Sequence, residues 1–214
     1  MNPEPAQTKR YLEIVEHYEA CLARHGDTHL GVDWPKLQDA QTRYRVMLEL
    51  IRNLPPSAVS LLDFGCGASH LYEYMVANGF AVIAYTGLDL SPKFVELCRK
   101  KFPQNCYICS DILEEPETVL SFDYIVMNGV FTEKRGLTFD EMLAYFERLL
   151  SAVFAKARVG LAFNVMTKHV DWERDDLFHL PLDMLARFLK ASLTRNFVIR
   201  NDYGLYEYTT YVYR

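Results

Sequence analysis

A glycine-rich turn, LLDFGCGASH at residues 61–70, carries the strongest chemical signal in the sequence. An apolar run ends on Asp63, and glycines follow two and four residues later, at Gly65 and Gly67. Glycine has no Cβ, so its backbone can adopt conformations and approach a ligand in ways closed to other residues. The turn is therefore a candidate ligand-binding loop at the end of a buried strand.

Three further apolar runs end in groups that suit a nucleotide-like ligand. They are GLDL with Asp89, SDI with Asp111 and Ile112, and MNGV with Asn128 and Gly129. In an open α/β sheet, ligands bind at the carboxyl ends of the strands. A carboxylate at Asp89 can accept hydrogen bonds from both hydroxyls of a ribose. Asp111 and Ile112 can bond to and cover the edge of an adenine.

Two ligands fit such an edge, a dinucleotide and S-adenosylmethionine. A dinucleotide loop has the pattern G-x-G-x-x-G, which brings a pyrophosphate to a helix N-terminus. Here the third glycine position holds the bulky His70. This weakens the pyrophosphate interpretation and favours the amino-acid-bearing ligand, with an NAD-binding dehydrogenase as the alternative.

The elements that must position these groups alternate along the chain. We expect strands at 59–65, 81–90, 105–112, 122–130 and 158–166, and helices at 69–79, 91–102, 138–157 and 181–193. Such alternation predicts a mostly parallel sheet covered on both faces. Two final strands, 196–203 and 206–214, are separated by only two residues, which predicts an antiparallel hairpin.

These motifs resemble those of the class I S-adenosylmethionine-dependent methyltransferases. LLDFGCGAS is similar to the first motif of that family, TGLDLSPKFVELCRKKF to the second, SDIL to the third and FDYIVMNGVF to the fourth. The resemblance covers about residues 57–214 and implies a Rossmann-like, doubly wound sheet of seven strands with the last antiparallel. It also implies that the methionine part lies by the glycine loop, the ribose by Asp89, the adenine by Asp111 and Ile112, and the sulfonium opposite Asn128 and Gly129. The expected cofactor-binding residues are Asp63, Gly65, Cys66, Gly67, Asp89, Leu90, Asp111, Ile112, Asn128 and Gly129.

Residues 1–56 precede this domain and carry two helical patterns, at 8–24 and 39–53. The loop between them, HGDTHLGVDWPK, is rich in polar residues and glycine. We expect this N-terminal part to fold over the cofactor as a lid. Trp34 is then either a core residue or an aromatic wall for the substrate, and Arg43 is either a solvated charge or a partner for the methionine carboxylate.

The acceptor of the methyl group is expected to be a small molecule. The net charge of -5 and the lack of a basic stripe argue against a nucleic-acid partner. The fourth motif continues as NGVFTEK rather than N-P-P-[YF], which marks amino-methylating enzymes of the superfamily. We therefore predict O-methylation of a hydroxyl on a polar or sugar-linked metabolite. An aromatic natural product, a carboxylate or a nitrogen remain alternative acceptors, and an inactive binding subunit of the same fold is an alternative function.

Histidines near the predicted mouth of the cleft are candidates for acceptor contacts. His169, close to Trp172, is the proposed catalytic and substrate-binding residue, while His70 and His179 are weaker candidates. Without a strong neighbour, each is more often a surface residue than a base.

The remaining features suggest an ordinary cytoplasmic protein. The sequence shows no apolar run long enough for a membrane span and no signal-peptide core. Its five cysteines are expected to be free thiols. Cys106 and Cys109 have CxxC spacing, but on a strand they point to opposite faces, so no metal site is predicted there.

Overall fold

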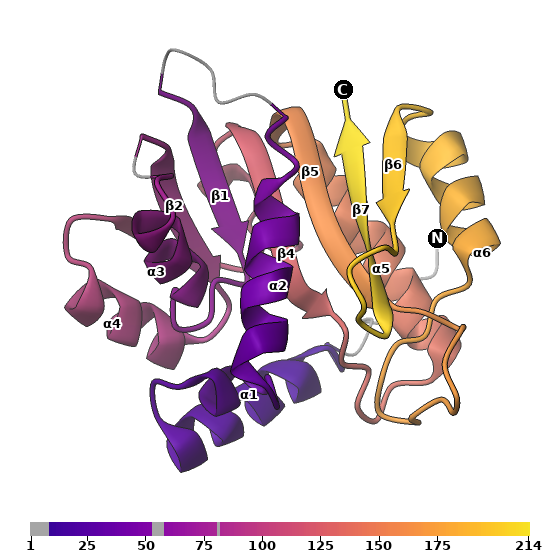
Figure 1. Cartoon of the computed structure of the whole chain (residues 1–214), viewed down its shortest axis with the longest axis horizontal. Coiled ribbons are helices and arrows are strands. Elements are labelled where there is room, and N and C mark those ends of the chain that lie inside the picture. The colour runs from indigo at the N-terminus through magenta and orange to yellow at the C-terminus, as the bar shows by residue number, and fades with distance from the viewer. Residues whose placement is uncertain (1–8, 53–57, 81) are drawn as a thin grey trace, which may run out of the picture.

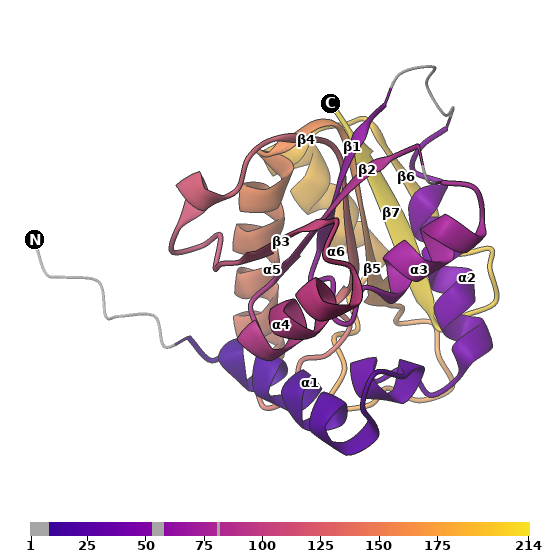
Figure 2. The same ribbon diagram turned by 90° about the vertical axis from the view of Figure 1, so that its left-hand side faces the viewer.

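The computed structural model describes residues 9–52, 58–80 and 82–214. Its centre is a seven-stranded sheet with helices on both faces (Figures 1 and 2). The strands are β1 (Ser60–Phe64), β2 (Ala84–Asp89), β3 (Cys106–Cys109), β4 (Phe122–Phe131), β5 (Ala157–Met166), β6 (Phe197–Arg200) and β7 (Glu207–Tyr213).

The strand order is β3-β2-β1-β4-β5-β7-β6. The first five strands pair in parallel, and β7 lies between β5 and β6, antiparallel to both. The winding reverses at β1, which pairs with β2 on one side and β4 on the other. The predicted mostly parallel sheet with an antiparallel C-terminal pair is confirmed. The switch point lies at β1 and β4, where a ligand is expected.

The helices divide into two layers. α2 (Leu37–Leu48), α3 (His70–Ala77) and α4 (Pro92–Lys101) supply buried side chains to one core, and α5 (Phe139–Phe154) and α6 (Leu182–Phe188) to the other. α6 continues into a π-helical turn, η3 (Leu189–Leu193), and a 3-10 turn, η2 (Pro116–Thr118), follows β3. Because both sheet faces are covered, the central strands are nearly continuous in apolar residues, as the sequence predicts.

Local signals start two of these helices. Ser91 caps α4 by accepting from the Phe94 N–H, and Pro92 occupies the first turn. Thr138 and Glu141 form the predicted capping box of α5, and the bonds from the Thr138 backbone and Arg10 lower the pKa of Glu141 to about 2. Both helix starts therefore follow from their own sequence.

The N-terminal part contributes one helix to the cleft edge and one to the core. α1 (Leu12–His25) crosses the carboxyl ends of the parallel strands, and the 3-10 helix η1 (His29–Val32) turns back onto it (Figures 1 and 2). By contrast, α2 packs on the sheet, with Tyr44 and Met47 buried in the same cluster as Leu61 and Tyr211. Of the two expected lid helices, only α1 lies over the strand ends.

Several element boundaries differ from the expected ones. The last two strands are joined by residues 201–206 rather than by two residues, since β6 ends at Arg200, whose guanidinium binds the Asp202 carboxylate (2.6 Å) in the turn. β3 ends at Cys109, so Asp111 and Ile112 lie in the following turn. The helices expected at 8–24 and 39–53 are observed as α1 (Leu12–His25) and α2 (Leu37–Leu48), and the strand expected from residue 81 begins at Ala84. Residues 8, 53–57 and 81 themselves, and with them the expected domain boundary, lie outside the described residues.

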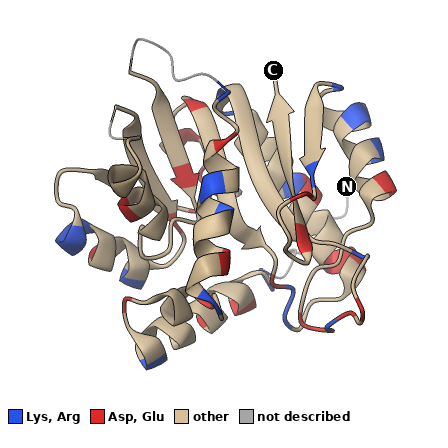
Figure 3. Ribbon diagram, viewed as in Figure 1, with Lys and Arg blue, Asp and Glu red and all other residues tan. Residues whose placement is uncertain are grey.

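The charges are mixed over the surface. In the view of Figure 3, Lys and Arg alternate with Asp and Glu on the helices and loops. Within the described ranges, no helix combines the length and apolar character that crossing a bilayer requires.

Candidate cofactor-binding cleft

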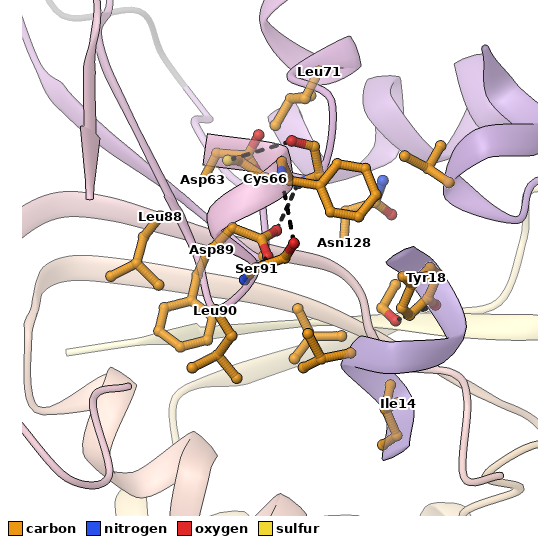
Figure 4. A pocket seen from close by; sticks show the side chains of 18 of the residues that line it. Ile14, Tyr18, Asp63, Cys66, Leu71, Leu88, Asp89, Leu90, Ser91 and Asn128 are labelled. Atoms are coloured by element: carbon orange, nitrogen blue, oxygen red, sulfur yellow. Dashed lines mark hydrogen bonds between the residues drawn. The ribbon is translucent and has the colours of Figure 1, made fainter. Parts of the chain in front are cut away.

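A cleft opens at the carboxyl ends of β1, β2 and β4, beneath α1 (Figure 4). From the sheet and its turns it is lined by Asp63, Phe64, Gly65, Cys66, Gly67, Leu88, Asp89, Leu90, Ser91, Asn128, Gly129 and Val130. From the helices and the N-terminal segment it is lined by Tyr11, Ile14, Val15, Tyr18, Val32, Trp34, Tyr44, His70, Leu71, Phe94 and Tyr145. Eight of the ten residues predicted to bind the cofactor from the strand ends thus meet in one cleft.

The glycine loop needs both of its glycines. Gly65 has φ +74° and Gly67 has φ +50°, a region that side chains with a Cβ rarely adopt. A Cβ on Gly65 would stand 2.7 Å from the Val130 Cγ2 atom. The Gly65 N–H also donates to the Leu88 carbonyl (2.7 Å), which fastens the loop to β2. The loop is thereby held with its backbone along the cleft wall.

Asp89 holds the same loop from below. One carboxylate oxygen accepts from the Gly67 N–H and the other from the Ser91 N–H, both at 2.9 Å. Burial raises the pKa of Asp89 to about 6, although these bonds oppose the shift. Each oxygen keeps a lone pair, so a side chain lining this cleft can still accept from ribose hydroxyls.

Asp63 is a second acid in the cleft wall, only 2% exposed. It accepts a hydrogen bond from the Tyr85 hydroxyl (2.8 Å). Burial raises the pKa of Asp63 to about 7, and the nearby Asp89 charge acts in the same direction. The hydrogen bond from Tyr85 lowers the pKa of Asp63, but burial outweighs it, so this carboxyl is costly to ionise.

The end of β4 carries a hydrogen-bond acceptor without a partner among the described residues and a glycine packed closely against an aromatic ring. The Asn128 Oδ1 atom is buried and has no hydrogen-bond partner among the residues that the structure describes. Gly129 has φ +82°, and a Cβ there would lie 2.8 Å from the Trp34 ring. The Gly129 N–H donates to the Asn164 Oδ1 atom (2.8 Å). The Asn128 Oδ1 atom is thus free to accept a hydrogen bond from a ligand, as far as the described residues go.

Arg43 stands behind the wall rather than in it. Its guanidinium stacks over the Trp34 ring at 4.2 Å, and its Nε atom donates to the Glu207 carboxylate (2.8 Å). Glu207 in turn accepts from the Asn164 amide (3.0 Å). Arg43 is not among the described residues that line the cleft. Glu207 holds the Nε side of the guanidinium against the Trp34 ring, while the Arg43 Nη1 atom is buried without a hydrogen-bond partner among the described residues. The contact with the methionine carboxylate stays a prediction.

Asp111 and Ile112 also fall outside the lining of the cleft, as far as its described residues go. Asp111 caps its own turn by accepting from the Leu113 N–H (3.0 Å), and it accepts from the Tyr11 hydroxyl (2.5 Å). Tyr11 stacks on Tyr145 with 4.8 Å between ring centroids, and both rings line the cleft. The flat wall at this end comes from α1 and α5, not from the third strand end.

His169 and Trp172 are not at the mouth of the cleft, contrary to expectation. Trp172 is 75% exposed, and neither residue is among the described lining residues. The physical reason is the pairing of their segment with the one after β4, where the Lys134 and Arg135 N–H groups donate to the Asp176 carbonyl (2.8 and 2.9 Å). This pairing keeps the segment beside the residues that follow β4, and none of residues 167–180 is among the described lining of the cleft.

The other two histidines have clear partners. His179 is buried and bonds through Nδ1 to the Thr167 carbonyl (2.7 Å). His70 lines the cleft, and its Nε2 atom lies 2.8 Å from the Asp27 carboxylate. Of the histidines considered from the sequence, His70 is the one that the structure brings to the cleft.

Helix α1 is fastened on both sides of the cleft. Glu19 contacts the Ser91 hydroxyl and the Lys93 ammonium, both at 2.6 Å. At the other end, Arg10 contacts the Glu141 carboxylate at the start of α5 (2.8 Å). Sequence patterns could not reveal these contacts, because they join residues more than 70 positions apart.

Comparison with known proteins agrees with this geometry. Residues 62–153 match a family model described as a methyltransferase domain. The chain is 32% identical over 158 residues to the Mycobacterium tuberculosis protein named "Putative methyltransferase Rv1506c", covering 72% of this chain and 92% of that protein. It is 30% identical over 90 residues to the malonyl-[acyl-carrier protein] O-methyltransferase of Priestia megaterium, covering 41% of this chain and 32% of that protein.

Solved structures show the same fold. Magnesium protoporphyrin IX methyltransferase from Synechocystis PCC 6803 with bound S-adenosylmethionine aligns over all of both chains with a TM-score of 0.66 and 14% identity. The same enzyme with the demethylated product aligns with a TM-score of 0.67 over 95% of this chain and 99% of that chain.

The chain therefore belongs to the class I S-adenosylmethionine-dependent methyltransferases. It is a methyltransferase whose cofactor is S-adenosylmethionine. The cleft suits this group, because the Asn128 Oδ1 atom lacks a donor that the methionine ammonium would supply. When bound, the cofactor supplies an activated methyl group on its sulfonium. The chain's own residues orient the two reactants and exclude water, which is the main demand of such a transfer.

Proposed function

We propose that this methyltransferase acts on an oxygen atom of a small molecule, with a hydroxyl of a polar metabolite as the preferred acceptor. The observation that carries the proposal is the cover over the cleft. Tyr18 from α1 and Trp34 from the following segment both line the cleft, next to Gly129 at the end of β4. A cover in this position supports a small acceptor, because it leaves little access for a macromolecule.

We further propose that residues 9–36 act as the lid, with α1 as its main element. The lid contacts α4 through Glu19 and α5 through Arg10, so it can open only by breaking ion pairs on both sides. Exposed pairs of this kind contribute little each. The lid is thus fastened weakly enough to admit and release ligands.

A second groove supports a polar acceptor. It adjoins the cleft, since Tyr44 and His70 line both, and its other walls are largely polar. Its polar and charged residues include Gln38, Gln41, Thr42, Arg45 and Glu73. An acceptor that reaches from the cleft into this groove would present hydroxyl groups to matching partners.

Deprotonation of a hydroxyl needs a base. Burial raises the pKa of the phenols of Tyr18, Tyr44 and Tyr145, which therefore stay protonated. Of the histidines considered from the sequence, His70 is the one in the cleft wall, where the Asp27 carboxylate orients it. We propose His70 as the base in place of His169.

A carboxylate acceptor is the second candidate. A carboxylate is already ionised near neutral pH and needs no base, which suits a cleft with many protonated phenols. The relative from Priestia megaterium is named as an O-methyltransferase of a malonyl-carrier protein. An aromatic acceptor would use the Trp34 and Tyr18 rings instead.

The test is a metabolite extract incubated with the protein and cofactor labelled in its methyl group. The proposal predicts label on a small molecule, and none with a Gly65→Val variant. Mild alkali then separates the two candidates, because a methyl ester releases its label and a methyl ether retains it. Label on RNA, on DNA or on an amino-acid side chain of a protein would refute the proposed acceptor class.

A further inference from the structure

A cluster of three metal-ligating side chains lies where α1 meets the segment after η1. The ligand atoms of His17, Cys21 and Asp33 all lie within 4.8 Å of one another. The His17 Nε2 atom is 2.7 Å from the Asp33 Oδ2 atom and 3.8 Å from the Cys21 Sγ atom. His17 and Cys21 are four residues apart on α1, so they share one helix face. The cluster belongs to the lid and is not part of the cofactor cleft.

The backbone of the turn brings Asp33 to this face. Asp33 has φ 57° and ψ 34°, a left-handed conformation that is uncommon outside glycine. The reversal before it is tight, since a Cβ on Gly31 would lie 1.9 Å from the Gly26 carbonyl oxygen. Only a glycine at position 31 allows η1 to lie so close to the end of α1. Asp33 thus adopts an uncommon backbone conformation in which its carboxylate contacts His17.

The three ligand types point to one class of ion. Imidazole nitrogen, thiolate sulfur and carboxylate oxygen together suit zinc, whereas magnesium and calcium take oxygen ligands. Tetrahedral bond lengths place two such ligand atoms about 3.3 to 3.6 Å apart. The spacing between His17 Nε2 and Asp33 Oδ2 is about 0.6 Å below the lower value, and that between His17 Nε2 and Cys21 Sγ is about 0.2 Å above the upper one. The ligand atoms of Cys21 and Asp33 lie within 4.8 Å of each other, so binding requires these side chains to rotate toward a common point.

We propose that His17, Cys21 and Asp33 bind a zinc ion, with a water molecule or a fourth ligand completing a tetrahedral site. Binding forms one bond each to the imidazole nitrogen, the sulfur and the carboxylate oxygen, and the Cys21 thiol proton is released to solvent. No electron is transferred.

The surroundings favour a cation at this point. Glu133, an acidic residue only 6% exposed, interacts electrostatically with the side chains of His17 and Asp33. Arg135 offsets part of that charge, with its Nη1 atom 3.2 Å from the Glu133 carboxylate. Cys21 is 8% exposed, whereas the Asp33 side chain is 37% exposed. The ion would therefore enter from the exposed Asp33 side and bind the buried Sγ atom of Cys21.

The consequence would be a stiffer lid. Tyr18 follows His17 directly, and Trp34 follows Asp33, and both of these rings line the cofactor cleft. Zinc would join the two segments that carry them. This consequence rests on the proposed lid, but zinc binding itself does not.

The experiment uses the full chain after treatment with a chelator. Zinc chloride is titrated by calorimetry, and cobalt chloride is titrated while the thiolate-to-metal charge-transfer absorption is followed. Variants Cys21→Ser and His17→Gln are compared with Cys106→Ser, which removes an exposed cysteine of β3. Binding of the demethylated cofactor is measured on every preparation, which shows that each variant is folded and tests the cofactor cleft separately.

We expect one zinc per chain and a charge-transfer band that is absent in Cys21→Ser and present in Cys106→Ser. Both ligand variants should lose about ten-fold or more in zinc affinity, since even an indirect partner of a metal ligand is worth that much. A wild-type chain that binds the cofactor product but takes up no zinc overturns the proposal. So does a Cys21→Ser variant with an unchanged band and affinity.

Discussion

At the carboxyl ends of the parallel strands, the turns after β1 and β2 are held by different contacts from the loops after β4 and β5. At β1 and β2, backbone groups fasten one turn to the next, with the Gly65 N–H on the Leu88 carbonyl and the Gly67 N–H on Asp89. After β4 and β5, the chain leaves the sheet in two loops that pair with each other, as between the Phe178 N–H and the Thr132 carbonyl (2.8 Å). The bonded residues are 22 or 23 positions apart in the turns and 46 positions apart between the loops. The difference teaches that the glycine loop forms a wall of the cleft because it is fastened to the neighbouring strand end, whereas the paired loops lie outside the described lining of the cleft.

The largest expected effect is at the glycine loop. In Gly65→Val, the positive φ costs about 1–2 kcal/mol, and the new Cβ would stand 2.7 Å from Val130. We expect affinity for the demethylated cofactor, measured by calorimetry, to fall by about 100-fold or more, which is roughly 3 kcal/mol.

The matched control is Gly79→Ala, at a glycine with φ +82° and open space around its missing Cβ. It should lose about 1 kcal/mol of unfolding free energy and bind the cofactor product normally. Equal binding by both variants would show that the glycine loop does not form the cofactor wall.

Asp89→Ala should have the next largest effect. The variant removes the acceptor of the Gly67 and Ser91 N–H groups and the carboxylate expected to hold the ribose. Bonds to charged groups are the stronger kind, so affinity should fall by on the order of 2–4 kcal/mol. Asp123→Ala is the control, because Asp123 accepts from the Ser60 N–H at the opposite edge of the sheet. If both variants bind the cofactor product equally well, the ribose assignment is wrong.

The buried acid Asp63 should make the cofactor-free protein sensitive to pH. Its pKa is about 7 when folded, against an ordinary value of 3.8, so the folded state binds more protons between these values. The free energy of unfolding therefore falls as the pH rises through this window. Between about pH 5 and about pH 7.5, the free energy of unfolding should decrease by roughly 2 kcal/mol less in Asp63→Asn than in the wild type. Urea unfolding at the two pH values measures it.

Asp123→Asn is the control for this effect, because bonds from the Ser60 N–H and hydroxyl and from Arg158 lower the pKa of Asp123. The Asp123 carboxylate stabilises the fold at pH values above its ordinary pKa. The Asp123→Asn variant should therefore still show the full decrease in the free energy of unfolding between the two pH values. An Asp63→Asn variant that keeps the whole fall would mean that Asp63 stays ionised in the folded protein.

The lid should give the smallest effect. Glu19→Ala removes the contacts of α1 with Ser91 and Lys93. Since one exposed ion pair contributes less than about 1 kcal/mol, we expect the cofactor product to dissociate about 2- to 5-fold faster in stopped-flow measurements. Glu96→Ala, which breaks an exposed pair with Lys100 within α4, is the control and should leave the rate unchanged. Indistinguishable rates in the two variants would argue against α1 as a lid.

The same difference explains how much the sequence could predict. Gly65, Gly67 and Asp89 are singled out by their own type and spacing, and the mostly parallel sheet follows from the alternation of elements. The strand order does not follow from that alternation. Tyr11 could not be found this way, because its place in the cleft depends on Asp111 and Tyr145, far along the chain. The sequence could not show that Arg43 contacts Glu207, because the two residues lie far apart along the chain. His169 was misplaced because the pairing of the two loops cannot be read from either loop alone.

Hydrogen exchange with and without the demethylated cofactor tests the central claim most directly, since it reports on the turns after β1 and β2 and on the loops after β4 and β5 in one measurement. The account predicts slower exchange at residues 65–67, 89–91 and 128–129 and along α1, with no change at residues 168–175. Protection confined to residues 168–175, or binding with no protection of the glycine loop, would contradict it.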